Sequence, residues 1–310
     1  LNYADRGQYD EGVAYLRQAV TMQRDLHPGP HPALATAISN LAFVLVNLDE
    51  LDEAEPLYRE ALRMNRRLLG AAHPELAASL NNLAWVLELR GRYGEAEGTY
   101  RESLEMSRRL LGDGHPSVAA TLYNMAFVRD ARGDRQGAEG LLRESLDIRR
   151  RTLGSEHPDV AAAANSLAIW LVEGGKLEEA AALIDESLAI RRKALGDGHP
   201  QVGSVLTVRA GLLLAERRLE ESAAVAAEAQ RLFAAALPPG HWQTAWAMSV
   251  QGAALAGLGR FAEAERLLLG SLEPLARSPI PGLQSQCRQR LAALYEAWGR
   301  PADAGKFRAG

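Results

Sequence analysis

Apolar side chains recur along this chain with a period of 42 residues. Counted from the histidine that opens each period, they occupy positions +7, +10, +11 and +14, a spacing that places residues on one face of an α-helix. Leu80, Leu83, Ala84 and Leu87 fill these positions in the second period. A second apolar stripe runs from +23 to +38 and in five of the six periods begins with an alanine, small enough for two helices to cross closely. The pattern predicts two amphipathic helices in each period and no β-strand.

Histidine, proline and glycine mark the ends of these predicted helices. Six of the seven histidines lie 42 residues apart, at His31, His73, His115, His157, His199 and His241. Proline follows the first five, which suits a first helical turn because its missing N–H has no partner to lose there. Glycine at +18 is typical of a residue that ends a helix, and in the fifth repeat Arg217 replaces it.

The predicted fold class is all-α, a solenoid of stacked helix-turn-helix repeats, since one hairpin cannot bury its apolar face alone. We expect a single solenoid over residues 1–310, made of half a repeat at 1–30, six repeats at 31–280 and a closing helical pair at 281–310. Pro281 and Gly299 are out of register in that last pair, which indicates a cap. Because Leu1 lies inside a half repeat and is not Met, we expect a fragment of a longer protein.

The second repeat also resembles a known family. The tetratricopeptide repeats of kinesin light chains are similar to it in His73-Pro74, Leu80-Asn81-Asn82-Leu83-Ala84, Gly91-Arg92-Tyr93, Glu95-Ala96-Glu97 and Leu111-Gly112-Asp113-Gly114-His115-Pro116. A tetratricopeptide repeat usually has about 34 residues, and the extra residues here lengthen the second helix and its loop, as in the kinesin-light-chain-like branch. The resemblance covers nearly the whole chain. It implies a right-handed superhelix whose first helices line a concave peptide-binding groove.

Polar and aromatic residues gather on the face of each first helix that lies opposite its apolar stripe. At about 100° per residue, this face holds positions +5, +8, +9, +12, +15 and +16. The candidate peptide-binding residues are Ser39, Asn40, Phe43, Asn81, Asn82, Trp85, Glu88, Tyr123, Asn124, Phe127, Asp130 and Asn165. Asparagine amides both donate and accept hydrogen bonds, so a ladder of them can hold the main chain of an extended peptide. Aromatic side chains one turn along would supply most of the binding energy.

The family resemblance implies the same role for Asn40, Asn82 and Asn124, because the matching residue of the family commonly holds peptide. Two alternatives stay open: repeated asparagines can bridge adjacent repeats, and the aromatic residues can pack between the helix layers. The ladder stops after the fourth repeat, where Val208 and Val250 replace asparagine. We therefore expect a bound peptide across repeats one to four.

Acidic residues on the same face bear on the choice of ligand. Glu88, Asp130 and Glu173 are predicted to face the groove. They argue against a simple preference for acidic ligands, in contrast to the acid-rich cargo motifs of kinesin light chains.

Composition and charge narrow the function classes. Apolar residues make up 47% and charged residues 24% of the chain, as in soluble folded proteins. The net charge of −4 offers no basic field for nucleic acid or an anionic membrane, and no apolar run approaches the roughly 20 residues that span a bilayer. Cys287 is the only cysteine, which suits a reducing, cytoplasmic location and inert packing.

The repeated histidines and charges are interpreted as structural. Stacked helices lie about 8–10 Å apart, so one histidine per repeat cannot converge on a zinc ion. We expect the histidines to anchor helix starts, and we expect neither a metal nor another cofactor. Arginine runs such as Arg66-Arg67 complement the helix dipole. Pairs such as Glu55 with Arg59 indicate a solvated outer face, although docking of a phosphorylated partner on the arginines stays possible.

No phosphate loop, nucleophile motif or zinc-protease helix occurs, so no catalytic residue is assigned. The leading hypothesis is a non-catalytic scaffold that binds a protein or peptide in its groove. The alternative is a sensory or autoinhibitory domain associated with a fused signalling enzyme, such as a kinase, a nucleotide-dependent switch protein or a protease. An enzyme in its own right is a third hypothesis, which no constellation of residues supports.

Overall fold

The computed structural model describes the backbone of residues 3–278 and 282–308, and side chains from residue 12 onward. Over these ranges the chain forms helices and no strand, as the apolar pattern predicts. The helices are α1 (Tyr3–Leu26), α2 (Pro32–Asn47), α3 (Leu51–Leu69), α4 (Pro74–Leu89), α5 (Tyr93–Leu111), α6 (Pro116–Ala131), α7 (Arg135–Leu153), α8 (Pro158–Glu173), α9 (Leu177–Leu195), α10 (Pro200–Ala215), α11 (Leu219–Ala236), α12 (Trp242–Gly257), α13 (Phe261–Leu275), α14 (Leu283–Ala297) and α15 (Pro301–Arg308).

Histidine side chains start the first helix of each of the six repeats. In every case the Nδ1 atom accepts a hydrogen bond from the backbone N–H two residues later, at 3.1–3.2 Å. This bond satisfies one of the N–H groups that a helix start leaves without an intrahelical partner. The predicted role of these histidines as helix-start anchors is confirmed.

The residue at +18 ends each first helix with a left-handed backbone. Four repeats have glycine there, at Gly91, Gly133, Gly175 and Gly259, with φ between 70° and 85°. Asp49 and Arg217 adopt the same conformation with φ of 66° and 63°, although both carry a Cβ atom. Glycine adopts this backbone conformation without steric cost, whereas a residue with a Cβ atom adopts it at a cost.

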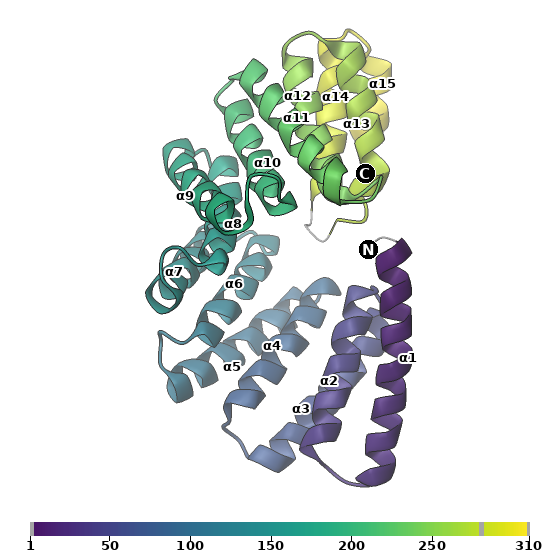
Figure 1. The fold of residues 1–310 in the computed structure, drawn as a ribbon, viewed down its shortest axis with the longest axis vertical. Helices are drawn as coiled ribbons and strands as arrows, with labels where there is room; N and C mark the ends of the chain where they lie inside the picture. The colour runs from purple at the N-terminus through teal and green to yellow at the C-terminus, as the bar shows by residue number, and fades with distance from the viewer. Residues whose placement is uncertain (1–2, 279–281, 309–310) are drawn as a thin grey trace. The chain divides into compact units, whose positions relative to one another are not determined.

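The chain divides into two compact units, residues 1–155 with α1 to α7 and residues 156–310 with α8 to α15. Within each unit, consecutive helices pair into hairpins, and the second helix of one hairpin packs on the first helix of the next (Figure 1). The fully buried core of the first unit includes Ile38, Tyr58, Leu80, Tyr100 and Leu122. The first helices of the second unit also pack on one another, α10 on α8 and α12, and α12 on α14.

Buried serines fasten three hairpins. Ser103, Ser145 and Ser187 each donate a hydrogen bond of 2.7–2.9 Å from Oγ to a carbonyl of the first helix, those of Ala77, Ala119 and Ala161. These serines occupy position +30, which the sequence assigns to the apolar stripe. They fit there because the carbonyl satisfies the hydroxyl inside the core.

The i,i+4 pairs of Glu55 and Glu97 were predicted to lie on a solvated outer face, and this prediction is wrong for the two glutamates. The two side chains are only 8% and 9% exposed. Glu55 accepts hydrogen bonds from Arg59 of its own helix and from Arg92 of the next repeat. Burial alone would raise the pKa of Glu55, but these arginine hydrogen bonds outweigh it and hold the pKa below its ordinary value.

The closing helices α14 and α15 join the second unit through aromatic and ionic contacts. The Arg300 guanidinium lies 4.8 Å from the ring centroids of both Tyr295 and Trp298, and its Nη1 donates to Glu265 of α13. Pro281 lies outside the described residues. The single solenoid over residues 1–310, its repeat boundaries and the capping role of the last pair stay predictions.

Candidate functional site

Nine of the predicted binding residues lie on the first helices of the first unit, α2, α4 and α6. They are Ser39, Asn40, Phe43, Asn81, Asn82, Trp85, Tyr123, Asn124 and Phe127, and we call this set the amide–aromatic strip. Asn40 and Phe43 are exposed, and the other seven side chains are half-buried. The whole strip is therefore accessible, at least in part, on the surface of the first unit.

The aromatic members contact one another along this strip. Phe43 is 52% exposed, and its ring centroid lies 6.0 Å from that of Trp85 on the next first helix. Trp85 itself packs partly against the core. Tyr123 and Phe127 meet edge to face at 5.2 Å, and the guanidinium of Arg149 lies 5.7 Å from the Tyr123 centroid. Such rings combine apolar area with rigid geometry, which suits them to anchor a partner.

The asparagines divide into two groups. Asn124 donates from Nδ2 to Oδ1 of Asn81 at 3.4 Å, a long bond that joins α6 to α4. This pair thus makes the bridge between adjacent repeats that the sequence left as an alternative. The side chains of Asn40 and Asn82 form no hydrogen bond with any part of the chain that the structure describes. Their amides are available to a ligand.

The acidic residues beside the strip are engaged with neighbouring side chains. Glu88 accepts a hydrogen bond of 3.0 Å from the Tyr100 hydroxyl on the second helix of its own hairpin. Burial raises the pKa of Glu88 to about 7, and the Tyr100 hydrogen bond offsets only part of that rise. A carboxyl of Asp130 lies 4.0 Å from Arg135. At neutral pH the acids beside the strip therefore present less free negative charge than the sequence suggests.

Asn165 and Glu173 belong to the second unit, where Asn165 is buried and Glu173 is exposed. Asn165 is only 8% exposed, and its buried Oδ1 accepts no hydrogen bond from any described residue. Glu173 accepts a hydrogen bond of 3.0 Å from Gln286 of α14. Val208 and Val250, which replace asparagine here, are 4% and 2% exposed. The helix-to-helix packing of α8, α10, α12 and α14 explains this burial.

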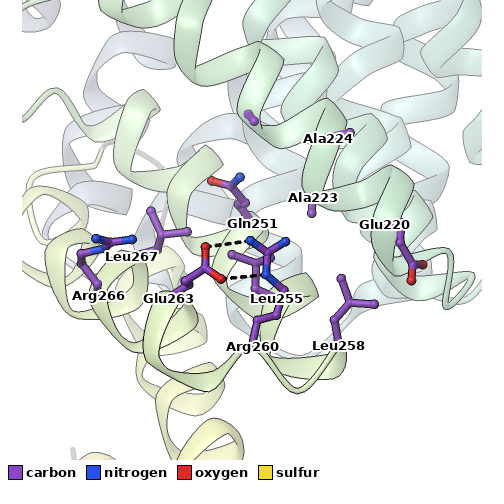
Figure 2. Close-up of a pocket in the computed structure, with 11 residues that line it drawn as sticks. Glu220, Ala223, Ala224, Gln251, Leu255, Leu258, Arg260, Glu263, Arg266 and Leu267 are labelled. Carbon is purple, nitrogen blue, oxygen red and sulfur yellow. Dashed lines mark hydrogen bonds and ion pairs between the residues drawn. The ribbon is translucent and has the colours of Figure 1, made fainter.

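A hollow of about 410 Å³ on the second unit was not predicted from the sequence (Figure 2). It lies among α11, α12 and α13, where Ala223 and Ala227 occupy the repeat positions of Glu55 and Arg59. Two alanines thus stand where the first repeat has a partly buried ion pair, and the missing side-chain volume explains the hollow. The signal was present at positions +24 and +28 of the fifth repeat.

Arg260 on the wall of this hollow forms only some of the hydrogen bonds that Arg92 forms at the same repeat position. Like Arg92, it donates from Nε and Nη2 to the glutamate three residues later, in this case Glu263, at 2.7 Å (Figure 2). The Nη1 of Arg92 also donates to Glu55. The Nη1 of Arg260 has no such acceptor among the described residues, because Ala223 stands at that position.

No group of three or more histidine, cysteine or acidic side chains in residues 12–278 and 282–308 is arranged to hold a metal ion. None of the described helices combines the length and apolarity needed to cross a bilayer.

The hairpins and their shared core define an α-helical repeat protein. The chain belongs to the tetratricopeptide repeat family: one family model matches residues 33–109, 87–151 and 117–193, and a second matches residues 1–33. Repeats of this family generally mediate protein–protein interactions and are generally not catalytic. A search of curated protein sequences finds no match.

Several solved structures share this fold and include kinesin-light-chain-like repeats. BtubC (BKLC) from P. vanneervenii is 25% identical, with a TM-score of 0.63, over 73% of this chain and 91% of that one. A putative kinesin light chain from Podosopora anserina is 26% identical, with a TM-score of 0.54, over 67% of this chain and 100% of that one.

Two more distant structures show likeness of fold alone. The apo form of RapI has a TM-score of 0.70 at 12% identity, over 88% of this chain and 94% of that one. A STAND signal-transduction ATPase with a tetratricopeptide repeat sensor, from Pyrococcus horikoshii, has a TM-score of 0.63 at 15% identity, over 88% of this chain and 41% of that one.

Proposed function

We propose that this chain is a non-catalytic scaffold that binds an extended segment of a partner protein along the amide–aromatic strip. The observation that carries the proposal is an exposed aromatic side chain, Phe43, next to amides without internal partners, those of Asn40 and Asn82. Exposed aromatic residues favour association, because their burial releases water from a large apolar surface. Unpaired amides can then hydrogen-bond the backbone of the bound segment.

The contrast between the two units supports this location. The first helices of the second unit bury Val208 and Val250 among themselves, whereas every member of the strip in the first unit is at least partly exposed. The proposal therefore places the ligand on α2, α4 and α6. The contribution of Asn165, and a cytoplasmic location, stay predictions.

A random peptide library displayed on phage and selected on the full chain tests the proposal. We expect selected peptides to lose at least tenfold in affinity when Asn40→Ala and Asn82→Ala are combined. The matched control combines Gln136→Ala with Gln289→Ala, two exposed amides on α7 and α14, and should bind as the wild type does. Peptides that bind the two double variants equally would contradict the strip as the binding surface.

A regulatory role within a larger signalling enzyme is the second candidate. It is favoured by likeness of fold to the STAND ATPase that carries a tetratricopeptide repeat sensor. The reading frame around this chain tests it directly, because a fused kinase, nucleotide-dependent switch or protease domain would be encoded there. A frame without any such domain would contradict this candidate.

A further inference from the structure

A second cavity, of about 380 Å³, lies in the first unit between the end of α1, the loop after it and the last turns of α3. Three guanidinium groups line it, those of Arg24, Arg63 and Arg67, against a single carboxylate, that of Glu60. Its formal charge is therefore +2, the difference between three cations and one anion, on a chain whose net charge is −4. The amide–aromatic strip contains none of these residues.

Two of the three arginines have no internal counter-ion. Arg24 donates from Nη2 to both carboxylate oxygens of Glu60 at 3.0 Å. Arg63 and Arg67 are exposed and form no ion pair or hydrogen bond with any residue in the described ranges. They lie four residues apart on one face of α3, an arrangement in which like charges repel and destabilise a helix. Local stability therefore does not account for this pair.

The following repeats place an acid where this repeat has an arginine. The position of Arg63 is occupied by Glu105 in the second repeat and by Asp147 in the third, whereas the position of Arg67 stays basic in both. The first repeat thus has two basic residues in an i,i+4 pair where the second and third repeats have an acid followed by a base. This basic pair occurs where α3 borders the cavity.

The loop before α2 lacks a second counter-ion. In the fourth repeat, Lys193 takes the position of Arg67 and donates to Glu156 of the preceding loop at 2.6–2.7 Å. The position of Glu156 in the first loop is Pro30. Arg67 therefore lacks the helix acid that Arg109 and Arg151 have four residues earlier, and it also lacks the loop acid that Lys193 has in the fourth repeat.

His27 adds a polar wall to the cavity. Its position is leucine in the later repeats, including Leu69, Leu111 and Leu153. The His27 ring stacks on that of His31, with centroids 3.5 Å apart and planes 7° apart, and it lines the cavity together with the guanidinium groups. An imidazole in place of leucine provides hydrogen-bonding nitrogen atoms there.

We propose that this cavity binds the phosphate group of a phosphorylated serine or threonine on a partner protein. A phosphate monoester carries about −1.5 to −2 charges at neutral pH and three acceptor oxygens, which matches the +2 charge and the two unpaired guanidinium forks. Met64 on the same wall is half-buried and offers apolar contact to the residues that flank the phosphate. The proposal goes beyond the peptide-binding strip and does not depend on it.

Titration of the isotopically labelled full chain tests the site, with the His27 imidazole signals as the local readout. The probes are acetyl-Ala-phosphoserine-Pro-Ala-amide, its unphosphorylated form and inorganic phosphate. We expect the phosphopeptide to shift the His27 signals and to bind at least tenfold more tightly than either other probe. Arg63→Glu should weaken its binding at least tenfold while leaving thermal stability unchanged or raised, because it restores the acid found at Glu105.

The matched control is Arg66→Ala. Arg66 is next to Arg67 in sequence, but its Nη2 donates to Glu102, and it does not line the cavity. This variant should bind the phosphopeptide as the wild type does. Equal binding of the phosphopeptide to wild type and Arg63→Glu would overturn the site. Inorganic phosphate that binds as tightly as the phosphopeptide would overturn the assignment to a partner protein.

Discussion

Phe43 on α2 and Trp85 on α4 bring their ring centroids to 6.0 Å although 42 residues separate them in the sequence. The contact follows from the repeat, because both residues occupy position +12 on neighbouring first helices. The two rings differ in burial: Phe43 is 52% exposed, whereas Trp85 packs partly against the core. One aromatic residue of the pair is thus held in place by the fold, and the other extends the apolar surface toward solvent.

The exposure of Phe43 predicts that its removal costs little stability. We expect Phe43→Ala to lower the free energy of unfolding by about 1 kcal/mol, since only the contact with Trp85 and a half-covered surface are lost. Urea denaturation measures this. The control is Phe233→Ala at a fully buried site, where a loss of about 3–5 kcal/mol is expected. Similar losses for the two variants would show that Phe43 is a core residue and unsuited to contact a ligand.

The left-handed backbone at Arg217 predicts a stabilising substitution. Arg217 has φ of 63° at the position where Gly91, Gly133 and Gly175 end the corresponding helices. Arg217→Gly relieves the steric cost of the Cβ atom, about 1–2 kcal/mol, and increases the entropy of the unfolded chain, which offsets part of that gain. We expect a net gain of about 0.5–1 kcal/mol in urea denaturation.

The control for this substitution is Ala224→Gly, at an exposed position in the interior of α11. It should lose about 1 kcal/mol, because glycine in a helix interior is unfavourable. A loss of stability in Arg217→Gly would show that the arginine side chain contributes more than its backbone conformation costs.

The periodic features of this chain could be predicted from the sequence, and the contacts between repeats could not. Helix ends follow from local chemistry, since the His31 type of cap and the Gly91 type of turn each depend on a few adjacent residues. Glu55 lies in a pattern that is typical of a solvated i,i+4 pair, yet it is buried by an arginine of the next repeat. Pairings of this kind depend on how two hairpins pack, which the period alone does not specify.

The same limit applies to the candidate site. Position +9 predicted the amides of Asn40 and Asn82 on one face, and the structure leaves both without internal partners. Periodicity could not predict that Asn124 would bond to Asn81, because that contact depends on the approach of α4 and α6. Nor could it predict that Asn165 would be buried, since this depends on the close packing of first helices in the second unit.

The raised pKa of Glu88 predicts a pH-dependent stability. Its pKa is about 7 in the folded chain and about 4.3 in an unfolded chain. Between these values the folded state binds more protons than the unfolded state, so the free energy of unfolding falls as the pH rises from about 4 to about 7. Glu88→Gln removes this dependence and keeps an acceptor for the Tyr100 hydroxyl. We expect it to be more stable than the wild type by roughly 1–3 kcal/mol at pH 8.

The comparison between pH 4 and pH 8 is made by thermal or urea unfolding of both proteins. The difference between the variant and the wild type should be larger at pH 8 than at pH 4. Glu105→Gln serves as a control, because Glu105 is an exposed carboxylate on α5, and its substitution should change stability by less than about 0.5 kcal/mol at either pH. A constant difference between Glu88→Gln and wild type across the pH range would contradict the raised pKa.

The hollow beside Arg260 predicts that an ion pair can be restored. Ala223 occupies the repeat position of Glu55, and Arg260 occupies that of Arg92, whose Nη1 donates to Glu55. Ala223→Glu should therefore place a carboxylate within reach of the Nη1 of Arg260 (Figure 2). We expect a gain of about 0.5–1 kcal/mol, a partly exposed ion pair having about that strength.

A double-mutant cycle separates this ion pair from a general effect of glutamate on α11. When Arg260→Ala is also present, Ala223→Glu should lose its gain and become destabilising, because a half-buried carboxylate then has no counter-ion. The cycle measures the coupling energy from the urea unfolding of four proteins. A coupling energy near zero would mean that Arg260 does not reach α11 as Arg92 reaches α3. The hollow would then not be explained by two missing side chains.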